Sequence, residues 1–133
     1  AFAAGALEKA FPYFIEYSNR RLLGDHVPYA IEAWPEGNQR HLSAESALYC
    51  RVIVEGLFGF RPSGLDSFYL RPYLPNSWEY MKLENVTAFG GRSIDINVIR
   101  KEKKLTVEVN ENKKTIYKKD MTDGDKIEIN LPE

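Results

Sequence analysis

The chain has 133 residues, 44% of them apolar and 13% aromatic, which is enough material for one packed domain rather than a disordered segment. The formal net charge of -1 excludes recruitment of nucleic acid or of an anionic membrane surface by overall charge. The single cysteine, Cys50, excludes an internal disulfide and a cysteine-based zinc site, and no apolar run is long enough to span a bilayer. We therefore expect neither nucleic acid nor a membrane as a partner.

The first segment, residues 2–23, carries the apolar pattern of an amphipathic helix. Its apolar residues fall mostly three, four or seven positions apart. Pro12 either kinks this helix or begins a second one, and Gly24 is a natural end. The chain starts inside this pattern, at Ala1, so we expect it to be preceded by further helical sequence.

Residues 44–60 predict a second helix that is apolar around most of its circumference. Only Arg51 and Glu55 interrupt it, four residues apart on one face. Such a helix needs neighbours on several sides, and one partner helix does not provide them. Cys50 lies within this run, so we expect it to be a small buried side chain.

From Arg61 onward the pattern changes to short stretches that alternate apolar and polar residues. They are rich in Val, Ile, Tyr, Phe and Thr, and turn sequences separate them. This predicts an antiparallel sheet or sandwich. The clearest alternation should place six side chains on one buried face: Ile94, Ile96, Val98, Leu105, Val107 and Val109. Basic residues between positions 100 and 119 favour protection of sheet edges over nucleic-acid binding.

The connection between the two helices, residues 30–46, concentrates acid–base and hydrogen-bonding side chains. Glu32, Trp34 and Glu36 alternate, so an extended backbone would point all three to one side. A carboxylate fixed in a cleft acts on water or a hydroxyl group, and an indole ring stacks on a sugar ring. These residues predict a sugar site.

In this interpretation the remaining polar side chains of the connection bind sugar hydroxyl groups; they are Asn38, Gln39, Arg40 and His41. The alternative is a solvated loop whose glutamates have no catalytic role and whose Trp34 fills a gap between helix and sheet. His26 and His41 have no partner at metal-ligand spacing, so we expect no metal site. No phosphate-cradling glycine loop is evident, and we expect no organic cofactor.

A longer motif follows. The second helix ends VEGLFGFRP, and the chain continues as F-x-L-x-P-x-LP-x-x-W from Phe68 to Trp78, before the strand sequence IDINV. With the glutamate-containing loop, this order resembles the carboxyl-terminal end of the six-hairpin, (α/α)6-barrel glycosidases, which include trehalase-like, glucosidase-I-like, rhamnosidase-like and disaccharide-phosphorylase-like enzymes. The resemblance covers essentially the whole chain.

The resemblance implies an α+β fold. Residues 1–60 would be a helical hairpin, the last helices of an incomplete (α/α)6 barrel, and residues 61–133 a small antiparallel β-sandwich. The amino-terminal part of the barrel would then be a missing partner of this chain, and would carry the general acid.

The resemblance also implies a catalytic role for the loop. Several of these families have a pattern close to E-x-Y-x-P-x-x-G that supplies the general base, and Glu32, Trp34, Pro35 and Gly37 are similar to it. Proline follows Trp34 directly, where the pattern has one intervening residue, which leaves Glu36 as an alternative base. The implied reaction is inverting hydrolysis of oligo- or polysaccharide, with carboxyl groups roughly 6.5 to 9.5 Å apart.

Three alternatives remain open. In a glycoside phosphorylase, inorganic phosphate would replace the water and no protein base would be needed. A non-catalytic carbohydrate-binding or structural module would cover its own apolar helix. A protein-interaction module would instead expose residues 44–60 and associate through them.

Overall fold

The computed structural model describes residues 1–21 and 43–132. The helical elements come first in the chain: a short 3-10 helix η1 (Phe2–Ala4), α1 (Leu7–Arg21), α2 (Ser43–Arg51) and a π-helical continuation η2 (Val52–Leu57). The strands follow: β1 (Arg61–Pro62), β2 (Ser67–Leu70), β3 (Tyr80–Phe89), β4 (Arg92–Lys101), β5 (Lys104–Glu111), β6 (Lys114–Met121) and β7 (Ile127–Asn130).

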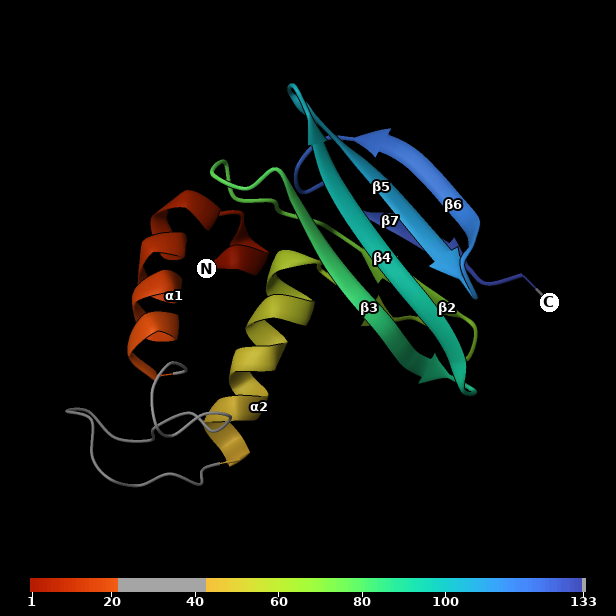
Figure 1. Cartoon of the computed structure of the whole chain (residues 1–133), viewed down its shortest axis with the longest axis horizontal. Coiled ribbons are helices and arrows are strands. Elements are labelled where there is room, and N and C mark those ends of the chain that lie inside the picture. Colours follow the sequence, from red (N-terminus) through yellow and green to blue (C-terminus); the bar gives the residue numbers. More distant parts are fainter. Residues whose placement is uncertain (22–42, 133) are drawn as a thin grey trace.

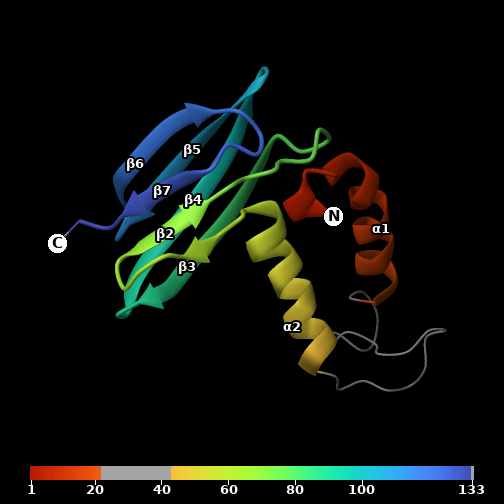
Figure 2. The same ribbon diagram turned by 180° about the vertical axis from the view of Figure 1, so that it is seen from behind.

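Within the described residues the strands form two antiparallel sheets. One has three strands in the order β1-β2-β7, and the other has four in the order β3-β4-β5-β6. The larger sheet lies in front in Figure 1 and the smaller one in front in Figure 2, so the two sheets pack face to face. The helices lie to one side of this sandwich in both views.

The predicted alternation in the sheet is confirmed. Ile96 lies opposite Val109, and Val98 lies opposite Val107, in the β4–β5 pair. All six residues assigned to one buried face are 0% exposed. Their polar neighbours along β4, such as Asp95, are only partly buried and point to the other face. The period of two in the sequence thus fixed which face of the sheet is buried.

The tight turns of the larger sheet also lie where the sequence predicted them. The β5–β6 hairpin turns on Asn112 and Lys113, with φ of 48° and 68°. Two consecutive residues with positive φ are typical of the type I′ turns that match the twist of a hairpin. Gly90 and Gly91 do the same between β3 and β4, with φ of 59° and 82°.

The first helix begins later than predicted. Gly5 adopts a left-handed φ of 77° and ends η1, so α1 begins only at Leu7. Pro12 lies inside α1 and does not begin a new helix. Residues 22–24, where the sequence predicted the helix end, lie outside the described residues.

The predicted fold class is wrong in its helical part. In the described residues the chain is mostly β, with two short helices and no helical hairpin of an (α/α)6 barrel. The two helices meet mainly through Tyr49, whose ring stacks on Phe14 with a centroid distance of 5.2 Å. Phe11 turns instead toward Trp78, with a centroid distance of 5.2 Å. An apolar stripe predicts that a helix is buried, but it does not specify the element that covers it.

Cys50 is exposed rather than buried, which also corrects the sequence prediction. Leu48, on the same helix, is 57% exposed, and burial becomes complete only at Gly56 and Leu57. The apolar character of α2 is therefore not used fully by the described residues. None of the helices in the described part of the chain has the length and apolar character of a membrane span.

An ion pair joins the two inner strands of the larger sheet, at the start of β4 and the end of β5. The Arg92 guanidinium donates two hydrogen bonds to the Glu111 carboxylate and a third, of 2.8 Å, to the carbonyl of Pro132. The hydrogen bonds from Arg92 hold the pKa of Glu111 below its ordinary value, and the charge of Arg92 acts in the same direction. This pair ties β4, β5 and the carboxyl-terminal segment together.

The aromatic centre of the sandwich gives a first test. Phe68 is 0% exposed, and the centroid of its ring lies 5.0 Å from the ring centroid of Phe60 and 5.4 Å from that of Phe89. We expect Phe68→Ala to lower the free energy of unfolding by about 3–5 kcal/mol, because it leaves a cavity among close-packed rings. Leu65→Ala is the control, since Leu65 is 95% exposed and its loss should change little. Equal effects of the two variants in urea denaturation would contradict this packing.

The Arg92–Glu111 pair gives a pH-dependent test. A carboxyl group whose pKa is lower in the folded than in the unfolded state stabilises the fold above its ordinary pKa, and that stability is lost as the pH falls through the lowered value. We therefore expect Glu111→Gln to be less stable than the unmodified chain near pH 7, and the difference to shrink below about pH 4. Arg92→Gln should show the same pattern in denaturation midpoints. A difference independent of pH would contradict the role of the pair.

Candidate ligand-binding site

The chain after β2 is held between the end of the helix and the turn before β7. The Arg71 N–H donates to the carbonyl of Phe58 at 3.1 Å, and the Tyr73 N–H donates to the carbonyl of Leu57 at 2.8 Å. On the other side, the Gly124 N–H donates to the carbonyl of Pro72 at 2.8 Å. Residues 71–73 therefore connect the helix to the sheets through the backbone itself.

Two glycines make this close approach feasible. A Cβ on Gly59, whose φ is 59°, would lie 2.5 Å from the carbonyl oxygen of Arg71. A Cβ on Gly124, whose φ is 82°, would lie 2.6 Å from the ring of Tyr73. Side chains at these positions would both strain the backbone and collide with their neighbours. The absence of a side chain at these two positions is consequently what allows the segments to lie this close together.

A cavity of about 270 Å³ opens at this junction, between the π-helical end of α2 and the smaller sheet. Its lining residues are Glu55, Gly56, Gly59, Arg61, Tyr69, Arg71, Tyr73 and Lys126. Among them are three cations and one carboxylate. Two tyrosine rings complete the wall.

Arg71 and Lys126 are both positioned by a neighbouring group. Arg71 Nε donates to the carbonyl of Gly124 at 2.9 Å, and its guanidinium carbon lies 5.5 Å from the centroid of the Tyr73 ring. Lys126 Nζ lies 3.5 Å from the centroid of the Tyr69 ring. These contacts are cation–π interactions, in which the ring face attracts the positive charge. They hold the two cations at the cavity without neutralising either.

Strand register places the third cation beside the same ring. Arg61 on β1 lies directly opposite Tyr69 on β2, and Tyr69 lies opposite Glu128 on β7. Residues paired in this way share a face of the sheet. Glu128 accepts a hydrogen bond of 3.0 Å from Ser63 and does not line the cavity.

Among the described residues, one carboxylate lines the cavity, and it is already paired. Glu55 accepts hydrogen bonds of 2.7 and 3.1 Å from Arg51, one turn earlier in the helix. These bonds lower the pKa of Glu55, and the charge of Arg61 adds a smaller effect in the same direction. Glu55 therefore stays ionised and bound to Arg51, so the three cations give the cavity a net positive charge.

The arrangement suits binding rather than acid–base catalysis. Arginine and lysine donors recognise carboxylate and phosphate groups, and tyrosine adds hydroxyl groups and apolar ring surface. In the described part of the chain, no His, Cys, Asp and Glu side chains gather in a group able to hold a metal ion. None of the described residues gives the cavity a carboxylate free to act on water.

The site residues predicted from the sequence lie outside the described residues. These are the two possible bases Glu32 and Glu36, together with Trp34, Asn38, Gln39, Arg40 and His41. Their roles stay predictions. The cavity residues were missed, although Tyr69, Arg71 and Tyr73 alternate in the sequence and Arg61 precedes them. That pattern alone is a weak signal of a binding site, because only the folded chain brings Arg61 and Lys126 beside these residues.

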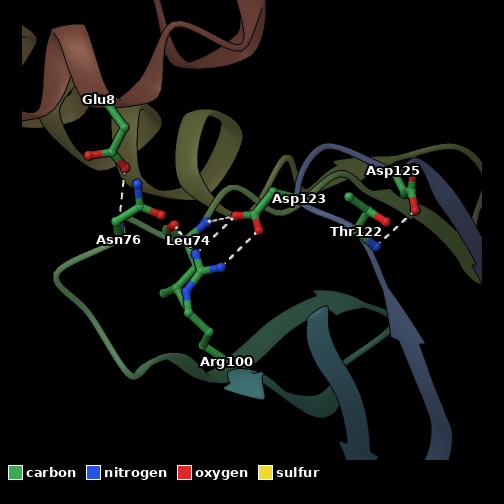
Figure 3. A network of polar contacts seen from close by, with 7 residues as sticks. All are labelled: Glu8, Leu74, Asn76, Arg100, Thr122, Asp123 and Asp125. Carbon is green, nitrogen blue, oxygen red and sulfur yellow. Dashed lines mark hydrogen bonds and ion pairs between the residues drawn. The ribbon is translucent and has the colours of Figure 1, made fainter. Parts of the chain in front are cut away.

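A second polar cluster lies next to the cavity and joins four segments (Figure 3). The Arg100 guanidinium at the end of β4 contacts both oxygens of Asp123 at 3.1 and 3.2 Å, and donates to the carbonyl of Leu74. Asp123 also accepts from the Leu74 N–H at 3.0 Å. Glu8 of α1 accepts from the Asn76 N–H at 3.0 Å.

This cluster is a structural connection. Its carboxylates are engaged by backbone N–H groups and by an arginine, so both ends of the segment that follows Tyr73 are fixed. Near it, Asp125 accepts from the Thr122 N–H at 2.9 Å and shapes the turn before β7 (Figure 3). The turn that carries Gly124 is thereby fixed relative to the sheets.

Comparison with protein-family models, with curated proteins and with solved structures gives no significant match. A functional assignment therefore depends on the predicted loop residues, on the motif between Phe58 and Trp78, and on the chemistry of the cavity.

The Arg100–Asp123 pair allows a test of the junction. We expect Asp123→Ala to lower the free energy of unfolding by about 1–3 kcal/mol, because it leaves the largely buried Arg100 charge and the Leu74 N–H without their acceptor. The control is Glu84→Ala, which removes an exposed partner of Lys82 and should change stability by no more than about 0.5 kcal/mol. Comparable losses in both variants, measured by chemical denaturation, would argue against this connection.

Proposed function

We propose that the chain is part of a glycoside hydrolase, with Glu32 as the general base and Trp34 as a sugar-stacking side chain. The proposal concerns the activity and its substrate class. It does not include the helical barrel, which the described helices contradict.

The supporting observation is the burial of the motif that carries the resemblance. Its apolar positions are at the centre of the protein: Phe68 is 0% exposed, and Leu70 and Leu74 are each 1% exposed. Pro72 is fully buried, and Trp78 packs edge-on against Phe11 of α1. The motif thus lies at the junction of helix and sandwich, and a cavity with tyrosine and arginine side chains lies beside that junction.

In the proposed reaction, Glu32 removes a proton from a water molecule that attacks the anomeric carbon. A carboxylic acid elsewhere in the enzyme protonates the departing glycosidic oxygen from the opposite face of the sugar. The configuration at the anomeric carbon is inverted, because the water attacks opposite to the leaving group. The residues of this chain supply the base but no assigned acid, so the isolated chain should be inactive.

A second candidate is a non-catalytic carbohydrate-binding module. The cavity favours it, since Tyr69 and Tyr73 line a binding space in which no carboxylate is free for catalysis. In this case sugar binding would be a property of the isolated chain, and substitution of Glu32 would leave hydrolysis by any attached domain unchanged.

Substitution of Glu32 in the complete enzyme tests the first proposal. We expect Glu32→Gln to lower kcat by about 10²- to 10⁴-fold with little change in KM, because the amide keeps the shape of the side chain but does not accept the proton. The measurement is steady-state hydrolysis of a chromogenic glycoside or of the natural saccharide.

Glu36→Gln is the matched control, since it makes the same chemical change two residues away. It should leave kcat within a few-fold of the parent enzyme. A large loss in Glu36→Gln alone would transfer the role to Glu36. Full activity in both variants would exclude a base in this loop and would favour the phosphorylase or binding-module alternatives.

A further inference from the structure

We propose that the cavity lined by Arg61, Tyr69, Arg71, Tyr73 and Lys126 binds a sugar ring that carries a carboxylate group. The choice of a sugar among carboxylate-bearing molecules rests on the proposed function, whereas the requirement for an anion rests on the cavity alone.

The cations of the cavity have no carboxylate partner in the described part of the chain. Arg51, Arg92 and Arg100 each bind a carboxylate of Glu55, Glu111 or Asp123. Arg61 and Arg71, together with Lys126, form no such pair. Three like charges that share one cavity repel one another, and an anion that enters it relieves this repulsion.

Arg71 is oriented by two contacts that leave part of its guanidinium available. Its Nε is used by the carbonyl of Gly124, and the ring of Tyr73 lies beside the guanidinium. Both Nη groups remain without a partner among the described residues. A planar pair of amino groups held in this way matches the two oxygens of a carboxylate, which accept two nearly parallel hydrogen bonds. Little side-chain entropy is lost on binding, because the guanidinium is already positioned.

The size and the lining of the cavity fit a single sugar ring. About 270 Å³ lies just below the roughly 300–1,000 Å³ typical of sites for drug-sized ligands, which suits one sugar ring rather than an oligosaccharide. The phenol group of Tyr69 offers a hydroxyl donor and acceptor, and the rings of Tyr69 and Tyr73 add apolar surface to the lining. A hydroxylated ring with one carboxylate uses both kinds of contact, whereas a bare phosphate ion uses only the cations.

Backbone hydrogen bonds within the described part of the chain hold the cavity in place. Its walls come from η2, β1, β2 and the turn before β7, held by the hydrogen bonds of Arg71, Tyr73 and Gly124. Binding is therefore expected of the 133-residue chain itself, without the remainder of an enzyme.

The test is calorimetric titration of the full 133-residue chain with glucuronate, with glucose and with inorganic phosphate, at low and at high salt. We expect glucuronate to bind at least tenfold more tightly than glucose or phosphate, and its affinity to fall as salt screens the cations. Arg71→Gln should weaken glucuronate binding at least tenfold, and Lys126→Gln should weaken it to a smaller extent. Lys119→Gln, which removes one positive charge from an exposed position on β6, should leave it unchanged.

Equal affinity for glucuronate and glucose would overturn the requirement for an anion. Equal affinity for glucuronate and phosphate would overturn the requirement for a sugar ring. Unchanged binding in Arg71→Gln would overturn the location. Weakened binding supports the location when circular dichroism shows the variant folded; if the variant is unfolded, Lys126→Gln decides, because Lys126 is exposed. The Glu32→Gln measurement is independent of all these results, so failure of one proposal leaves the other to be judged by its own experiment.

Discussion

The rest of the structure depends on the way in which residues 71–74 are held between the helix and the two sheets. Backbone hydrogen bonds join this segment to the last residues of η2 on one side and to Gly124 on the other. Asp123 adds a bond to the Leu74 N–H and binds Arg100 at the end of β4. Each bond contributes only about 0.5–1.5 kcal/mol, but together they fix a helix end, a turn and a strand relative to one another.

Residues 68–74, which comprise most of β2 and this segment, supply both the core and the cavity. Phe68, Leu70 and Leu74 point into the sandwich. Tyr69 and Arg71, which alternate with these residues in the sequence, line the cavity. An alternating chain has two faces, and here one face is close-packed and the other is open to a ligand. The positions of the cationic groups are therefore set by the packing of their apolar neighbours, which makes the geometry of the site a consequence of core stability.

The strands could be predicted from the sequence because their signal is local. Ile94, Ile96 and Val98 alternate with polar residues, and the turns that separate the strands contain residues suited to positive φ. The prediction of the helical part failed for a different reason. The periodicity of residues 2–23 and 44–60 indicates a buried face but not its partner, so neither the exposure of Cys50 nor the absence of a hairpin in the described residues follows from it. The cavity was missed because Arg61, Arg71 and Lys126 meet only through strand register and the turn at Gly124.

The assembly of the cavity from separate segments also explains how a chain with a nearly neutral net charge has a positively charged cavity. The net charge of -1 is a sum over the whole sequence, and it excludes attraction of a polyanion at long range. It does not describe a cavity whose three cations come from β1, from the segment after β2 and from the turn before β7, with its one carboxylate already bound to Arg51. An anion in this cavity would contact all three segments at once. Because it would bind only when they are assembled, its binding free energy would add to the stability of the same junction that forms the site.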